Sequence, residues 1–144
     1  RFGLRRRRRS VRRMRLEPYV RVDDLGFDAT PAAVLSRRGR PRTRGRNSVG
    51  LDELDYGEAV YRFQASGRLE EVTRRAPALY LLDHDVVVDL PFAALAPHVR
   101  RRDADAFERA GFLVSPRYGL VFVPAEPDWV TALARHCIGT WRAL

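Results

Sequence analysis

Two pairs of short apolar segments constrain the fold more than any other feature of this sequence. The first pair is 59–63 and 69–73, and the second is 112–114 and 120–123, with a glycine in each intervening turn. Apolar and β-branched residues on both sides of such a turn are typical of β-hairpins. Three more segments have the composition of short strands: 19–22, 79–82 and 86–88. The chain should therefore build an antiparallel sheet around two hairpins.

Helix signals lie between these strands. Thr30 stands one residue before a proline, which is a common N-cap arrangement, and the helix that follows should end at Gly39. A second apolar face, with the i, i+3, i+4, i+7 spacing of a helix, runs from 92 to 99, where Pro97 predicts a kink or a break. A short helical turn is expected from Asp103 to Gly111.

Residues 128–143 are predicted to close the chain as an amphipathic helix. Its apolar stripe comprises Val130, Leu133, Ala134, Cys137 and Trp141. The predicted fold class is therefore α+β: an antiparallel sheet of two hairpins plus further strands, backed by two to four helices.

A weak internal repeat makes a tandem helix-hairpin repeat one version of this fold. Asp24-Leu25 recurs 65 positions later as Asp89-Leu90, whereas Tyr56-Gly57 recurs 62 positions later as Tyr118-Gly119. The unequal spacing leaves both the single and the tandem arrangement open.

The net charge of +9 is concentrated at the N-terminus. Residues 1–15 hold nine of the 27 basic residues and no acidic residue, so the rest of the chain is formally neutral. We expect residues 1–15 to form a basic, disordered tail and residues 16–144 to form a single globular α+β domain. Alternatively Met14 is the natural start and residues 1–13 are not native. The chain lacks an apolar run long enough to span a bilayer, so we expect a cytoplasmic protein and no membrane partner.

No motif in the sequence indicates chemistry. It contains no glycine-rich phosphate loop, HExxH or CxxC pair, which predicts no cofactor, no metal site and no catalytic residue. Asp83-His84-Asp85 offers metal ligands or an acid and a base, but neighbours on a strand point to opposite faces, so we expect a solvated connection. His136 and Cys137, adjacent in the predicted helix, should point about 100° apart, and His98 should lie on the surface.

The segment 37–47 is rich in Gly, Pro and Arg and is predicted to be an exposed loop. Arginines recur there at every second position, as Arg38, Arg40, Arg42, Arg44 and Arg46. In an extended loop they would lie on one side and could bind carboxylates or phosphates, whereas the alternative is a passive, solvated loop.

Residues 30–73 resemble a known structural module. Thr30 and Val34 in a helix, then Gly39-Arg40-Pro41, then the hairpin with Gly67 are similar to the helix, Gly-x-Pro and hairpin module of the β-lactamase inhibitor protein fold and of small outer-membrane assembly lipoproteins. The resemblance implies a sheet backed by helices whose exposed face binds another protein. We expect neither a signal peptide nor a lipid-anchor cysteine here, in contrast to the lipoproteins, and the second half of the chain matches the module poorly.

These observations favour a non-catalytic protein-binding module of inhibitor or immunity type, whose partner has an acidic surface. A second hypothesis is a nucleic-acid-associated protein that uses the tail and the loop at 37–46. A third is an enzyme with its site near Asp83–Asp85, which would require those side chains to line a pocket.

Overall fold

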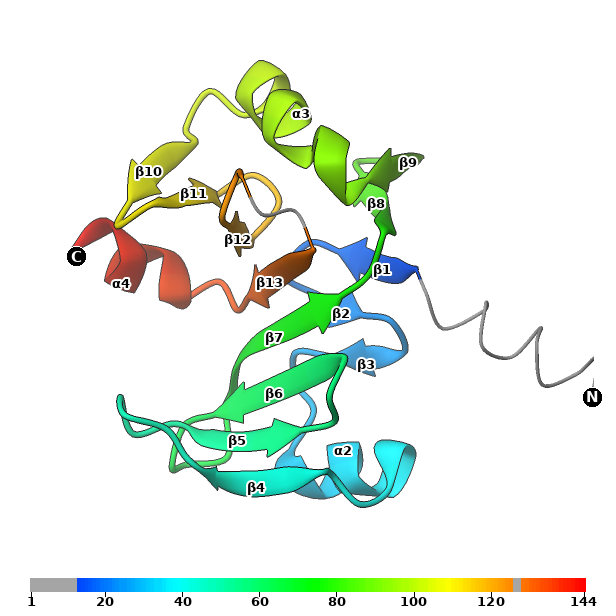
Figure 1. Cartoon of the computed structure of the whole chain (residues 1–144), viewed down its shortest axis with the longest axis vertical. Helices are drawn as coiled ribbons and strands as arrows, with labels where there is room; N and C mark the ends of the chain where they lie inside the picture. The colour runs from blue at the N-terminus through cyan, green and yellow to red at the C-terminus, as the bar shows by residue number, and fades with distance from the viewer. Residues whose placement is uncertain (1–12, 126–127) are drawn as a thin grey trace, which may run out of the picture.

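Each half of the chain forms a helix followed by four antiparallel strands (Figure 1). The structure is a computed structural model that describes residues 13–125 and 128–144. In the first half these elements are α2 (Pro31–Arg38), β4 (Thr43–Arg46), β5 (Asp52–Asp55), β6 (Ala59–Phe63) and β7 (Leu69–Arg75). In the second half they are η1 (Phe92–Ala94), α3 (Leu95–Arg102), β10 (Phe107–Arg109), β11 (Phe112–Ser115), β12 (Leu120–Phe122) and β13 (Trp129–Leu133). The chain closes with α4 (Cys137–Arg142).

The two four-stranded units join into one sheet. Strands β7 and β13 pair antiparallel, with Thr73 opposite Thr131, so the order is β10-β11-β12-β13-β7-β6-β5-β4. A second sheet has the order β3-β2-β1-β8-β9. Its strands are β1 (Met14–Glu17), β2 (Arg21–Val22), β3 (Leu25–Gly26), β8 (Ala78–Asp83) and β9 (Val86–Pro91).

The main core lies between the two sheets. Leu16 and Leu79 from the five-stranded sheet belong to the same buried cluster as Tyr61 and Leu120 from the eight-stranded sheet. Helix α2 contributes Val34 to this cluster, and η1 and α3 also add buried apolar side chains. In Figure 1, α2 and α3 lie at opposite ends of the molecule, so each closes one end of the core. No helix in the described part of the chain is both long and apolar enough to cross a membrane.

Helix α2 forms where its capping residues predict it. Thr30 Oγ1 accepts a hydrogen bond from Ala33 N at 3.1 Å, and Gly39 ends the helix with a φ of +80°. Pro97 does not break α3, because the helix begins at Leu95 and Pro97 therefore lies in its first turn, where its missing N–H has no helical acceptor.

The predicted α+β fold class is wrong, because the molecule is mostly β. Strands account for 42% of the described residues and helices for 19%, in sheets of eight and five strands with only about three short helices. The two predicted hairpins form, but each is part of a longer four-stranded meander.

The predicted closing helix at 128–143 accounts for most of this difference. Strand β13 occupies its first part and α4 only its last. Val130 and Ala132 face the main core, whereas Leu133 packs in a second cluster on the other face of the sheet. Because an internal strand buries apolar residues on both faces, its sequence lacks strict alternation and resembles a helix stripe.

Three smaller differences between the prediction and the structure involve edge strands and a turn. Residues 43–46 pair with β5 instead of forming a loop, and residues 107–109 form β10 where a helical turn was predicted. The strand predicted at 19–22 is shorter, because a turn at Tyr19 separates β1 from β2. Residues 1–12 of the predicted tail lie outside the described residues, whereas Met14 and Arg15 belong to β1.

Candidate functional site

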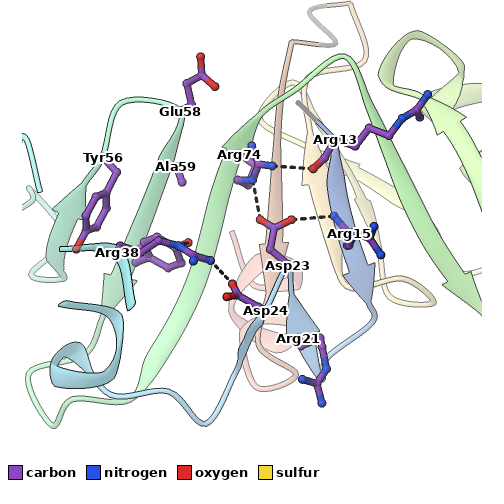
Figure 2. Close-up of a pocket in the computed structure, with 11 residues that line it drawn as sticks. Arg13, Arg15, Arg21, Asp23, Asp24, Arg38, Tyr56, Glu58, Ala59 and Arg74 are labelled. Atoms are coloured by element: carbon purple, nitrogen blue, oxygen red, sulfur yellow. Dashed lines mark hydrogen bonds and ion pairs between the residues drawn. The ribbon is translucent and has the colours of Figure 1, made fainter. Parts of the chain in front are cut away.

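An arginine-rich cleft of about 720 Å³ lies where β1, β2 and the turn before β3 meet α2 and the first meander (Figure 2). Five arginines, three carboxylates and two tyrosines line it: Arg13, Arg15, Arg21, Arg38, Arg74, Asp23, Asp24, Glu58, Tyr56 and Tyr61, with Ala59. The excess of arginine over carboxylate favours an anionic group in this cleft.

Arg74 and Asp23 form the floor of the cleft. Arg74 is only 6% exposed, and its Nε donates to Asp23 Oδ2 at 2.8 Å. Its Nη2 donates to the Arg13 carbonyl at 2.9 Å, while the other Asp23 oxygen accepts from Arg15 N at 3.0 Å. This pair connects β7 of one sheet with β1 of the other, so it holds the two walls together.

Arg38 crosses the cleft from the end of α2. It donates to Asp24, as Figure 2 shows. Its Nε also donates to the Tyr61 hydroxyl at 3.1 Å. The hydrogen bond from Arg38 lowers the pKa of Asp24 below its usual value. Arg38 is therefore held in place by two partners and is oriented before any ligand arrives.

The rim arginines are more exposed. Figure 2 shows the side chains of Arg13 and Arg21 directed away from the floor. Arg13 and Arg15 lie over the ring of Tyr80, with guanidinium-to-centroid distances of 4.9 and 5.4 Å. Arg13 also pairs with Asp89. The rim thus presents positive charge to solvent on an aromatic support.

The structure distributes the five arginines of 38–46 over adjoining surfaces. Arg38 belongs to the cleft, and Arg46 pairs with Asp52 at 3.3 Å. The other three, Arg40, Arg42 and Arg44, line a neighbouring hollow of about 560 Å³. They are exposed, and Arg42 lies against Gly57.

Tyr56 separates the cleft from this hollow. Its hydroxyl donates to the Gly39 carbonyl at 2.8 Å, and its ring lines the cleft. Burial raises the pKa of Tyr56, and the positive charges of Arg38 and Arg44 oppose that rise. The cleft and the hollow therefore form one basic surface, which we call the arginine surface and define as Arg38, Arg40, Arg42 and Arg44 around Tyr56.

Comparisons with protein-family models, curated proteins and solved structures find no match. The chemistry of the arginine surface and the cleft is therefore the main guide to function.

Asp83, His84 and Asp85 do not converge. Asp83 is buried and accepts hydrogen bonds from the Tyr118 hydroxyl at 2.8 Å and Arg117 Nη2 at 2.9 Å. His84 adopts a φ of +57° in the turn between β8 and β9, where it and Asp85 are exposed. Burial alone would raise the pKa of Asp83, but the hydrogen bonds from Tyr118 and Arg117 hold it below its usual value. Asp83 therefore serves as an internal anion.

Sequence reasoning missed the cleft residues Asp23 and Arg74. One available signal was the place of Arg74 in β7, where it follows Val72 by two residues and so faces the core side of the strand. A charged residue at an inward position requires a partner. No feature of the sequence around Arg74 identified that partner as Asp23, which lies 51 positions away.

Proposed function

We propose that this chain is a non-catalytic protein-binding module of inhibitor or immunity type, which binds an acidic segment of another protein along the arginine surface. One observation carries the proposal: Tyr56 lines the cleft together with Arg38, and its hydroxyl donates to the carbonyl of Gly39, which lines the hollow together with Arg40, Arg42 and Arg44. Three of the four guanidinium groups belong to exposed residues, and for these no acidic partner is found within the described chain.

The backbone of strand β4 can also contribute to binding. It ends the eight-stranded sheet, all four of its residues are exposed, and its outer side pairs with no other strand among residues 13–125 and 128–144. An unpaired edge can accept an extended segment of another protein by strand addition. The arginines of this edge discourage self-pairing and favour a segment with carboxylates.

The resemblance of residues 30–73 to the inhibitor module supports the same type of function. The alternative, nucleic-acid binding, uses the same charges, since phosphates and carboxylates both suit arginine. Pairing at an open strand edge favours a polypeptide, because phosphodiester strands offer no matching row of amide groups.

Binding of two labelled probes tests this proposal. The first is an eight-residue peptide that alternates Glu and Thr, and the second is a single-stranded oligonucleotide of equal charge; fluorescence anisotropy is recorded over a range of salt concentrations. We expect the full chain to bind the peptide more tightly than the oligonucleotide. Replacement of Arg40, Arg42 and Arg44 by Ser should weaken peptide binding about tenfold, since each exposed charge contributes roughly 0.5 kcal/mol.

The matched control replaces three exposed arginines outside this surface, Arg68, Arg100 and Arg101, by Ser. It removes the same formal charge and should change peptide binding by less than about twofold. Equal losses of peptide affinity in the two triple variants would show that only the net charge matters, and this would contradict the proposal. Tighter binding of the oligonucleotide would favour the nucleic-acid alternative.

A further inference from the structure

Three metal-ligating side chains meet at the other end of β7, away from the arginine surface. They are Glu70 in β7, His136 just before α4, and Cys137 at the first position of α4. One ligand atom from each lies within 4.8 Å of the other two. The sequence predicted no metal site here, because it placed His136 and Cys137 together inside a helix.

The backbone explains why these residues converge. Strand β13 ends at Leu133, and Ala134 N then donates to the Glu70 carbonyl at 2.8 Å. The chain turns before α4, and His136 is the N-cap of that helix with an αR backbone, so the side chains of His136 and Cys137 both start beside the end of β13. Both side chains can therefore reach Glu70.

The carboxylate of Glu70 is oriented toward this point. Gln64 Nε2 donates to Oε1 at 2.7 Å, which leaves Oε2 for the other two residues. Oε2 contacts His136 Nε2 and lies 2.7 Å from Cys137 Sγ. The Oε2 atom of Glu70 thus contacts both the His136 ring nitrogen and the Cys137 sulfur, while the side-chain amide of Gln64 holds Oε1.

We propose that Glu70 Oε2, His136 Nε2 and Cys137 Sγ bind a zinc ion, with water in the fourth position. A mixed oxygen, nitrogen and sulfur set suits zinc and excludes calcium and magnesium, which require oxygen ligands. Ionised Glu70 and Cys137 with neutral His136 supply two negative charges, which balance the divalent cation. His136 is 31% exposed at its side chain, so the fourth position faces solvent and an entry path exists.

The ion would connect β7 to the junction of β13 and α4. The Cys137 side chain already packs in the second apolar cluster with Val114, Val121 and Leu133. Zinc binds the thiolate, so loading releases the thiol proton to solvent. Because the ion binds the folded chain, loading should raise the melting temperature.

Titration of the chain, without an affinity tag, with Co²⁺ tests the site, because the absorption spectrum of bound cobalt reports its ligands. We expect one equivalent to give a sulfur-to-cobalt charge-transfer band in the near ultraviolet and the visible bands of a tetrahedral ion. Zinc should then displace cobalt and remove both. Cys137→Ser should abolish the charge-transfer band.

Three variants probe the other positions. His136→Asn changes an exposed side chain and should weaken zinc binding by more than about 100-fold, whereas Gln64→Ala removes only the orientation of Glu70 and should weaken it by about 10- to 100-fold. The control is His84→Asn, at an exposed histidine in a distant turn, which should leave the affinity unchanged. Melting curves in the presence of a chelator establish that each variant folds.

Absence of the charge-transfer band, or equal zinc affinity of the His136 and His84 variants, would overturn the proposal. If buried Cys137→Ser fails to fold, the comparison of His136→Asn with His84→Asn still decides the question. None of these readouts depends on the arginine surface, so the two proposals can fail separately.

Discussion

Asp23 and Asp24 are neighbours in the sequence but have different surroundings. The Asp23 side chain is 21% exposed and pairs with Arg74, whose own side chain is 7% exposed. The Asp24 side chain is 56% exposed and pairs with Arg37 and Arg38 at the edge of the cleft. The two pairs therefore differ in how much water screens them, although the charges are the same.

This difference predicts unequal effects on stability. Asp23→Asn should lower the free energy of unfolding by about 3 kcal/mol, because it removes the carboxylate charge that pairs with the buried guanidinium of Arg74. Asp24→Asn should lower it by less than about 1 kcal/mol, because the Asp24 side chain is 56% exposed and water screens its ion pairs. Asparagine tolerates the φ of +55° at position 23, so backbone strain is not added.

Urea denaturation of the two variants, followed by circular dichroism, measures both values. Equal decreases in the free energy of unfolding would contradict this prediction, because the ion pair at the floor of the cleft would then contribute no more to stability than the pairs at its edge.

At the scale of elements, α3 holds a histidine in an unusual environment. His98 is buried, contrary to its predicted surface position, and its Nε2 lies 3.4 Å from the Tyr118 hydroxyl. Burial, followed by the positive charges of Arg101 and Arg102, lowers the pKa of His98 below 6.5. The carboxylate of Asp83 opposes this shift, and Arg117 adds to it.

The lowered pKa of His98 makes stability depend on pH. As the pH falls through 6.5, the unfolded chain gains a proton on His98 before the folded chain does, so the free energy of unfolding decreases. The slope should be at most about 1.4 kcal/mol per pH unit, and it should end below the folded pKa. His98→Gln, which does not titrate, should flatten this part of the profile. Urea midpoints between pH 7.5 and 5.5 measure it.

The control for this experiment is His84→Gln, at an exposed position, which should retain the slope of the original chain. A slope that persists in His98→Gln would assign the pH dependence to another group. Asp83 has a lowered pKa, so its contribution is lost only at more acidic pH.

At the scale of the whole molecule, the two halves share their hydrogen bonds and their core. Strands β7 and β13 join the meanders, and β1 pairs with β8 in the second sheet. The main core cluster includes residues of both halves, such as Tyr61 and Leu120. Neither half can bury its inner face alone, so the domain should unfold as one unit.

The positions of the tryptophans allow a test of this cooperativity. Both Trp129 and Trp141 lie in the second half, so tryptophan fluorescence reports on that half, whereas far-ultraviolet circular dichroism reports on both. We expect the two probes to give the same urea midpoint. Midpoints that differ by more than the experimental error would show that the halves unfold separately.

The sequence determined the local features of this protein. Thr30 and Gly39 cap the two ends of α2, and a glycine with positive φ lies in the turn of each predicted hairpin. Both features depend on only a few neighbouring residues. The alternation of arginines at 38–46 is visible in the sequence, but the prediction of a loop missed that residues 43–46 form β4. The sequence could not predict which other charges lie beside these arginines.

Only the tertiary structure decided which segments became internal strands and which side chains meet. Residues 129–133 form β13 because β7 offers backbone partners and both faces are covered, and this outweighs a pattern that also fits a helix. Asp23 meets Arg74, and Glu70 meets His136, across separations of 51 and 66 residues. A buried charge requires a partner, but the identity of that partner depends on how distant strands pack, which no local pattern contains.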